Sequence, residues 1–347
     1  MQILQDEFNK SIAELVASAK TEAELEAIAA SAPEMLNEIL NRLPKTILES
    51  IKRDAYQGGL DEIRQSHLDF KARNYQRWKD GFDALELFIG ICTEAGDNFN
   101  KRLRPTATKN GDILFDTITR LHAKGCLVAK EIACLLTNGF ADGAHSRWRA
   151  LHEITVTSKF LTEKGTDTVE RYLAHEYVDS YKGACQHKKY EERLQAAPLS
   201  DHAIASLKVK YDEAISRYGS DFSNLYGWAE DTLGKKRANF ADLEKSVDLD
   251  HWRPYYKWSS QNIHASAKTI RSSLGMTETS ADLLLVGSSD SGMTDPAHSM
   301  AISLSQVTVN LLQLSPNLDN AVAMKIILEM TNEIGDLFLK VHKQKST

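Results

Sequence analysis

Apolar residues recur at helical spacing along almost the whole chain. In residues 1–43 this pattern predicts two short amphipathic helices separated by a turn. Residues 31–34, Ser-Ala-Pro-Glu, are typical of a helix start, because serine caps a helix and proline is tolerated in its first turn. We expect Pro44 and the pair Gly58-Gly59 to interrupt the chain after these helices.

The same period continues to the C-terminus. It predicts further helices over about 60–97, 113–138, 142–160, 168–195, 200–217, 240–248, 297–314 and 317–342. Asn138-Gly139 is the expected stop before the third of these helices, and Asp142 its expected cap. Strand-like alternation is nearly absent, and the apolar run Leu283–Val286 is too short to seed a sheet.

Residues 97–112 are predicted to form a loop. The segment carries four cations, Lys101, Arg102, Arg104 and Lys109. Such a loop is either a solvated connector or a patch that contacts phosphates.

The pattern therefore predicts an all-α fold, a multi-helix bundle with an N-terminal helical appendage. We place the appendage at residues 1–80 and the main helical domain at 81–347. A chain of 347 residues is longer than one typical domain, which agrees with this division. With only 18 glycines and 7 prolines, the composition also disfavours an all-β sandwich.

Charge and cysteine usage narrow the classes of function. The net charge of -6 excludes a general polyanion binder, so a nucleic acid would need a local basic patch. The four cysteines form no C-x-x-C pair, which excludes a zinc ribbon and a dithiol redox motif. The N-terminus lacks the layout of a signal peptide and no long apolar run is present, so we expect no membrane span and a cytoplasmic protein.

The segment 144–153 carries the densest set of candidate site residues. Counted at about 100° per residue, His145, Arg149 and His152 share one side of a helix, with Glu153 at its edge. Arg149 and Glu153 have the i,i+4 spacing of an intrahelical ion pair. These groups either form a site or fix the helix against its neighbours.

A second cluster lies at residues 251–264. His251, Trp252, Arg253 and Tyr256 interleave aromatic rings with cations, a composition that stacks on bases and holds phosphates. The same composition also suits a packed loop between helices. Asn262 and His264 follow closely as further candidates, together with His145 and His298.

The third candidate is the Gly/Ser-rich segment 287–298. No Gly-Lys-Ser/Thr follows, so it is not a phosphate-binding loop of the Walker type. Asp295 as a cap and Pro296 at the first position predict a helix start, which places His298 in the first turn, where anions bind. The segment is either a ligand lid or only a loop.

A metal site assembled across helices stays open as an alternative. Its candidate ligands are His145, Glu153, His175, Glu176 and His264. The pair His175-Glu176 is not followed by a second histidine at the spacing of a zincin.

The spacing Arg147-x4-His152 resembles the R-x4–6-H signature of the HEPN (higher eukaryotes and prokaryotes nucleotide-binding) ribonucleases. The resemblance implies a helical bundle that dimerises and cleaves RNA without metal, with arginine on the phosphate and histidine moving protons. Trp148 departs from the polar residue common after the arginine in that family. Arg147 also lies about 140° around the helix from His152, so both reach one site only with a bend or a dimer.

A broader resemblance covers residues 80–315. Gly143–Glu153, Tyr226-Gly227-Trp228, His251–Tyr256, Asn262-Ile263-His264 and Asp295–Ser299 resemble an uncharacterised bacterial family of helical proteins, a domain of unknown function. The resemblance implies a helical fold and a distant relationship to HEPN-type proteins, many of which act in toxin–antitoxin or anti-phage systems.

The leading hypothesis is a metal-independent endoribonuclease that needs no cofactor and acts as a homodimer. Its candidate catalytic residues are Arg147, Arg149, His152, Glu153 and His264, and its candidate substrate-binding residues are His145, His251, Trp252, Arg253, Tyr256, Asn262 and His298. Arg147 or Arg149 would hold the phosphate and His152 would be the acid and base. The alternatives are a non-catalytic module that binds a nucleotide or partner protein, and a helical-bundle metalloenzyme.

Overall fold

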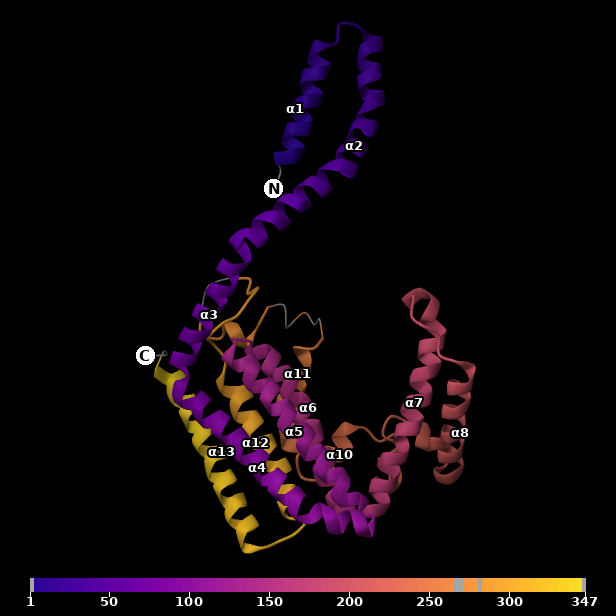
Figure 1. The fold of residues 1–347 in the computed structure, drawn as a ribbon, viewed down its shortest axis with the longest axis vertical. Coiled ribbons are helices and arrows are strands. Elements are labelled where there is room, and N and C mark those ends of the chain that lie inside the picture. The colour runs from indigo at the N-terminus through magenta and orange to yellow at the C-terminus, as the bar shows by residue number, and fades with distance from the viewer. Residues whose placement is uncertain (1–2, 265–266, 268–270, 280–282, 345–347) are drawn as a thin grey trace. The chain divides into compact units, whose positions relative to one another are not determined.

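The computed structural model confirms the all-α fold. It describes residues 3–264, 267, 271–279 and 283–344, and these contain helices and turns but no strand. The chain divides into two compact units, Met1–Asp69 and Phe70–Thr347 (Figure 1). Residues 70–80 therefore belong to the second unit. None of the helices in the described part of the chain combines the length and hydrophobicity needed to cross a membrane.

The first unit is built from α1 (Ile3–Ser18), α2 (Glu22–Asp54) and the beginning of α3 (Leu60–Arg77). The helix start expected at residues 31–34 is wrong. The Thr21 hydroxyl accepts a hydrogen bond from the Glu24 backbone N–H (3.3 Å) and the Glu24 carboxylate accepts one from the Thr21 backbone N–H (3.2 Å), so α2 begins before this segment.

Pro33 and Pro44 both lie inside α2, and the interruption expected at Pro44 is absent. Each proline removes one backbone donor and disturbs one turn, and Figure 1 shows α2 bent along its length. A further kink lies at the π-helical turn η1 (Ala55–Gly59), where Gly58 has a φ of 140° that a side chain would resist.

The second unit is a bundle of five long helices. They are α4 (Lys79–Asn110), α5 (Ile113–Thr137), α6 (Ala141–Lys164), α12 (Thr294–Leu312) and α13 (Leu318–Gln344). The helix α12 packs against each of the other four, so it is the centre of the core (Figure 1).

Buried polar side chains fix the position of α12 against α6. The Trp148 indole donates to the Ser303 hydroxyl (2.9 Å), and the Thr155 hydroxyl donates to the Ser303 carbonyl (3.1 Å). Further along, the Asn310 amide donates to the Ser158 hydroxyl (2.8 Å). Because a buried polar group without a partner is costly, these bonds allow only one register of the two helices.

The loop predicted at 97–112 is wrong, because α4 continues to Asn110 and includes Pro105. Phe99 and Ala107 are buried in the core on one side of this segment, and Arg104 forms an ion pair with Asp116 of α5. Tertiary packing therefore outweighs the local cost of the proline. The turn to α5 is short and passes through Gly111, whose φ is 62°.

Shorter elements flank the bundle. The helices α7 (Thr166–Leu194) and α8 (Asp201–Tyr218) pack side by side (Figure 1). They are followed by η2 (Ser220–Ser223), α9 (Gly227–Leu233), α10 (Phe240–Ser246), η3 (Asp250–Trp252), α11 (Arg253–Gln261) and η4 (Leu274–Met276). Both α10 and α11 pack on α6, which places them over its polar face.

Two predicted caps are wrong. Asp142 lies inside the first turn of α6, and its carboxylate accepts hydrogen bonds from the backbone N–H groups of Leu274 (2.9 Å) and Gly275 (3.2 Å). Asp142 thus binds the backbone N–H groups of η4 and does not cap its own helix, α6. The helix α12 begins at Thr294, so Asp295 and Pro296 are already inside its first turn.

The candidate lid before α12 is tied to the bundle. The Ser289 backbone donates to the Gly139 carbonyl (2.9 Å) and its hydroxyl to the Gly275 carbonyl (2.6 Å). Arg77 also donates to the Asp290 carbonyl (2.7 Å). These three hydrogen bonds anchor Ser289 and Asp290, just before α12, to the bundle.

We predict that Gly96→Ala destabilises the bundle. A β-carbon at Gly96 would lie 2.2 Å from Cε1 of His122, whose Nε2 is 3.1 Å from the Thr308 hydroxyl in α12. Relief of this overlap must move a buried side chain, so the free energy of unfolding should fall by about 1–3 kcal/mol. Urea titration followed by circular dichroism measures this change.

Gly90→Ala on the same helix is the matched control. A β-carbon at Gly90 meets nothing within 4 Å, and alanine is the better helix former, so this variant should be as stable as wild type or more stable. Equal effects of the two substitutions would contradict the packing argument.

Candidate functional site

The polar face of α6 begins with a buried stack of rings. His145 and Trp148 are stacked with centroids 5.5 Å apart, and Trp148 contacts His152 at 5.3 Å. Trp258 of α11 contacts His145 edge-on at 5.0 Å. The spacing of these side chains along α6 places all three rings on one side of the helix, and the sequence predicts this placement for His145 and His152.

A buried carboxylate joins His152 to an arginine. His152 Nε2 lies 2.9 Å from Oε1 of Glu244 in α10, and the two side chains are 1% and 0% exposed. The second Glu244 oxygen forms an ion pair with Arg253 of α11, whose side chain is 23% exposed. The pairing reaches from the interior to the surface, because Arg253 is the only one of the three side chains that solvent contacts appreciably.

A second ionic pair lies beside the first. Arg149 Nε is 3.1 Å from Oε1 of Glu153, and their side chains are 28% and 39% exposed. The same oxygen accepts a hydrogen bond from the Tyr256 hydroxyl. The i,i+4 pair predicted from the sequence is therefore confirmed, and Tyr256 ties it to α11.

Tyr256 connects the two ionic pairs. The Cζ atom of Arg149 lies 4.8 Å from the centroid of the Tyr256 ring, and that of Arg253 lies 5.1 Å from it. Both distances are those of cation–π contacts. We call the six residues of this arrangement the Arg–Tyr cluster: Arg149, His152, Glu153, Glu244, Arg253 and Tyr256.

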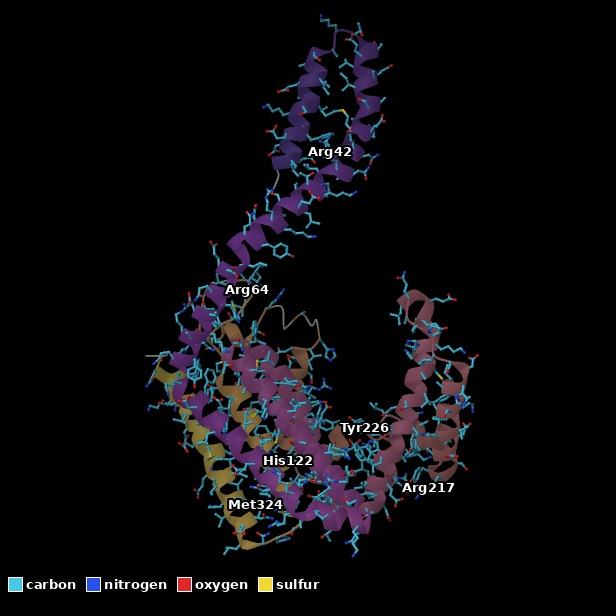
Figure 2. All side chains as sticks on the ribbon, viewed as in Figure 1. Arg42, Arg64, His122, Arg217, Tyr226 and Met324 are labelled. Atoms are coloured by element: carbon cyan, nitrogen blue, oxygen red, sulfur yellow. The ribbon has the colours of Figure 1, made fainter. Side chains whose placement is uncertain are left out.

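Two tyrosines at the cluster keep their protons at neutral pH. Burial, followed by the hydrogen bond to the Glu153 carboxylate, raises the pKa of Tyr256 far above its usual range. Burial, followed by the charge of Glu153, raises the pKa of Tyr226 to about 12. Tyr226 lies just before α9, and Figure 2 labels it. Both phenols are therefore hydrogen-bond donors and not bases.

The cluster does not include Arg147. This arginine forms an ion pair with Glu131 of α5, whereas His152 pairs with Glu244 of α10. The two side chains of the R-x4-H spacing thus have different partners on different helices, as their separation around α6 implies.

The remaining candidates near α11 have separate surroundings. Trp252 packs against Trp148 at 6.3 Å, and the exposed His251 contacts Trp252. Asn262 lines a cavity of about 750 Å³ together with Arg271. His264 is exposed on the turn after α11, where its backbone N–H donates to the Gln261 carbonyl (3.2 Å).

His298 belongs to another part of the bundle. A β-carbon on Gly335 of α13 would lie 2.6 Å from its ring, so His298 packs in the interface of α12 and α13. Burial lowers its pKa, which Asp336 and Asp295 oppose.

The proposed metal ligands are not gathered. His175 Nε2 is 2.9 Å from the Asn224 carbonyl, and Glu176 is exposed on α7. Within the described ranges, no three His, Cys, Asp or Glu side chains form a group that could hold a metal ion.

Sequence reasoning missed Glu244 and Tyr226. Glu244 follows Phe240 by four residues and precedes Val247 by three, which places it on the apolar face of a short helix. A carboxylate at such a position needs a buried partner, and this is the signal that could have found it. Tyr226 belongs to the string Tyr226-Gly227-Trp228 that carries the family resemblance, but its residue type alone indicates no role at the site.

We predict that His145 makes the protein less stable as the pH falls. Its ring nitrogens have no hydrogen-bond partner among the described residues, and burial lowers its pKa to about 4 against the opposing charge of Asp142. The unfolded chain, with a histidine pKa of about 6.5, binds more protons between these values, so stability is lost as pH falls from about 6.5 toward 4. When the pH is lowered from 7 to 5, wild type should therefore lose about 2 kcal/mol more of its unfolding free energy than the His145→Phe variant.

Urea unfolding at the two pH values measures this difference. His202→Phe, at an exposed position of α8, should leave the pH dependence as it is in wild type. A His145→Phe variant that loses as much stability as wild type would show that His145 does not cause the effect.

Comparison with known proteins finds similarity to parts of the chain only. The chain is 26% identical over 174 residues to protocadherin gamma-B7 of Homo sapiens and of Pan troglodytes, which covers 47% of this chain and 17% of each relative. The chain thus spans about a sixth of the length of these curated relatives. No solved structure matches. Residues 115–281 match a Family of unknown function (DUF5677), and this segment contains the whole Arg–Tyr cluster.

Proposed function

We propose that the Arg–Tyr cluster binds the backbone of single-stranded RNA and that the protein cleaves it without a metal ion. The supporting observation is the placement of two partly exposed guanidinium groups, Arg149 and Arg253, over the ring of Tyr256. Arginine presents a rigid fork of donors that matches a phosphate. Trp252 and the exposed Tyr255 beside them offer rings on which bases stack.

The resting charges of the cluster nearly cancel. Arg149 is paired with Glu153, and Arg253 with Glu244. A phosphate that binds between the guanidiniums must compete with these carboxylates. Glu153 is the more exposed of the two acids and can turn toward solvent, whereas Glu244 is enclosed. Binding should therefore release Glu153 from Arg149 and leave the Glu244 pair intact.

Glu153 is the proposed base. Its carboxylate takes the proton of the 2′-hydroxyl, the 2′-oxygen bonds to phosphorus, and the bond to the 5′-oxygen breaks. The 5′-oxygen takes a proton from water, so the products are a 2′,3′-cyclic phosphate and a 5′-hydroxyl. His152 is enclosed behind Glu244 and acts as a positioning residue for Arg253.

A second candidate is a binding or sensor module without catalysis. It is supported by the burial of His152 and Glu244, since their ion pair serves to hold α10 and α11 on α6. In this case a nucleotide or partner protein would engage the arginines, and no bond would be cut.

We predict that Arg253→Ala reduces cleavage of end-labelled single-stranded RNA in EDTA by about 100-fold or more, because a phosphate contact is lost. Glu153→Gln should have a comparable effect, because the base is lost. The measurements are the cleavage rate and the identity of the new RNA ends. Arg147→Ala is the matched control on α6, since this arginine pairs with Glu131 outside the cluster.

The outcomes separate the two candidates. RNA binding that is lost in Arg253→Ala, with no cleavage in wild type, would support the module without catalysis. Cleavage that is unchanged in Arg253→Ala and Glu153→Gln would exclude the cluster as the site. Arg253→Lys, which keeps the buried charge of Glu244 paired, tests the phosphate fork if the alanine variant does not fold.

A further inference from the structure

The first unit consists of helices without a core. Among residues 4–69 no side chain is buried, although α2 alone is 33 residues long. It instead exposes large apolar side chains, most of them in its second half: Leu36, Ile39, Leu40, Ile47, Leu48 and Ile51. Helices of this kind gain most of their stability from burial of an apolar face, so this unit lacks the usual source of stability.

Most of these side chains form one stripe that α1 does not cover. At about 100° per residue, Leu36, Leu40, Ile47 and Ile51 lie within one third of the helix circumference. Ile28, which is half-buried, lies on a different side of α2 from this stripe. Figure 1 shows the helix α2 continuing past α1, and Arg42, which Figure 2 labels, lies between Leu40 and Ile47 along the chain.

Charge is segregated along the same two helices. We call residues 3–38, which are α1 and the first half of α2, the hairpin, and residues 39–54 the stem. The hairpin has eight acidic and two basic residues, whereas the stem has four basic and two acidic residues. Two parallel copies would place stem against stem and acid against acid, whereas two antiparallel copies place each stem beside the acidic hairpin of the other.

We propose that the first unit pairs with the same unit of a second copy of this chain, with the two α2 helices antiparallel. The contact is self-complementary under a two-fold axis near Glu38, so a single surface satisfies both copies. The stem stripe then packs on the apolar side chains that the hairpin exposes, which include Leu25 and Leu36. The occupant is a second copy of this chain, because the acidic hairpin of one copy complements the basic stem of the other.

Sedimentation of the full chain tests the pairing. We expect a dimer for wild type and a monomer for the double variant Leu40→Glu/Ile47→Glu, which charges the stripe at exposed positions. Leu127→Glu/Leu173→Glu adds the same charge at exposed positions of α5 and α7 and should remain a dimer. A monomeric wild type, or a dimer that persists in the stem variant, would overturn the proposal.

Pairs of spin labels test the orientation. In a background with Cys134→Ser and Cys185→Ser, Asn37→Cys, at an exposed position beside the stripe, should bring its two labels close together. Glu26→Cys should separate them by about 36 Å along the helix axis, because twelve residues on each side of the two-fold axis rise 1.5 Å each. Short distances at both positions would indicate parallel helices and contradict the proposal.

Discussion

The buried carboxylate of Glu244 is the constraint on which the site depends. A charge without solvent must be paired, and Glu244 has two partners, His152 from α6 and Arg253 from α11. One carboxylate thus holds three helices in fixed positions. Tyr256 follows Arg253 by one turn of α11, so the same pairing brings its hydroxyl to Glu153.

The helix α6 serves the core and the site with different residues. Trp148 is fully buried and its indole donates to Ser303 of α12, which anchors α6 in the bundle. Arg149, the next residue, is turned away from the bundle and contacts Tyr256. Adjacent positions on a helix point about 100° apart, so one segment can be rigid on one side and reactive on the other. This rigidity is what a preorganised site requires.

The two units differ in the source of their stability. The second unit has a continuous core around α12, with buried polar bonds that fix its register. The first unit has amphipathic helices and no buried side chain in its described residues. A capping box at Thr21 nevertheless fixes the N-terminus of α2. Local signals therefore specify its helices, while their burial depends on a second surface.

Sequence alone determined the all-α class and the faces of α6, because periodicity and i,i+4 spacing are local properties. It placed His145, Arg149 and His152 on one side and paired Arg149 with Glu153. It could not show that residues 97–110 are helical, since Phe99 and Ala107 become core residues only when α5 is packed beside them. Nor could it show that Arg253 shares the Glu244 carboxylate with His152 while Arg147 pairs with Glu131. These pairs depend on which helices supply Glu131 and Glu244, and distant carboxylates meet their arginines only through the tertiary fold.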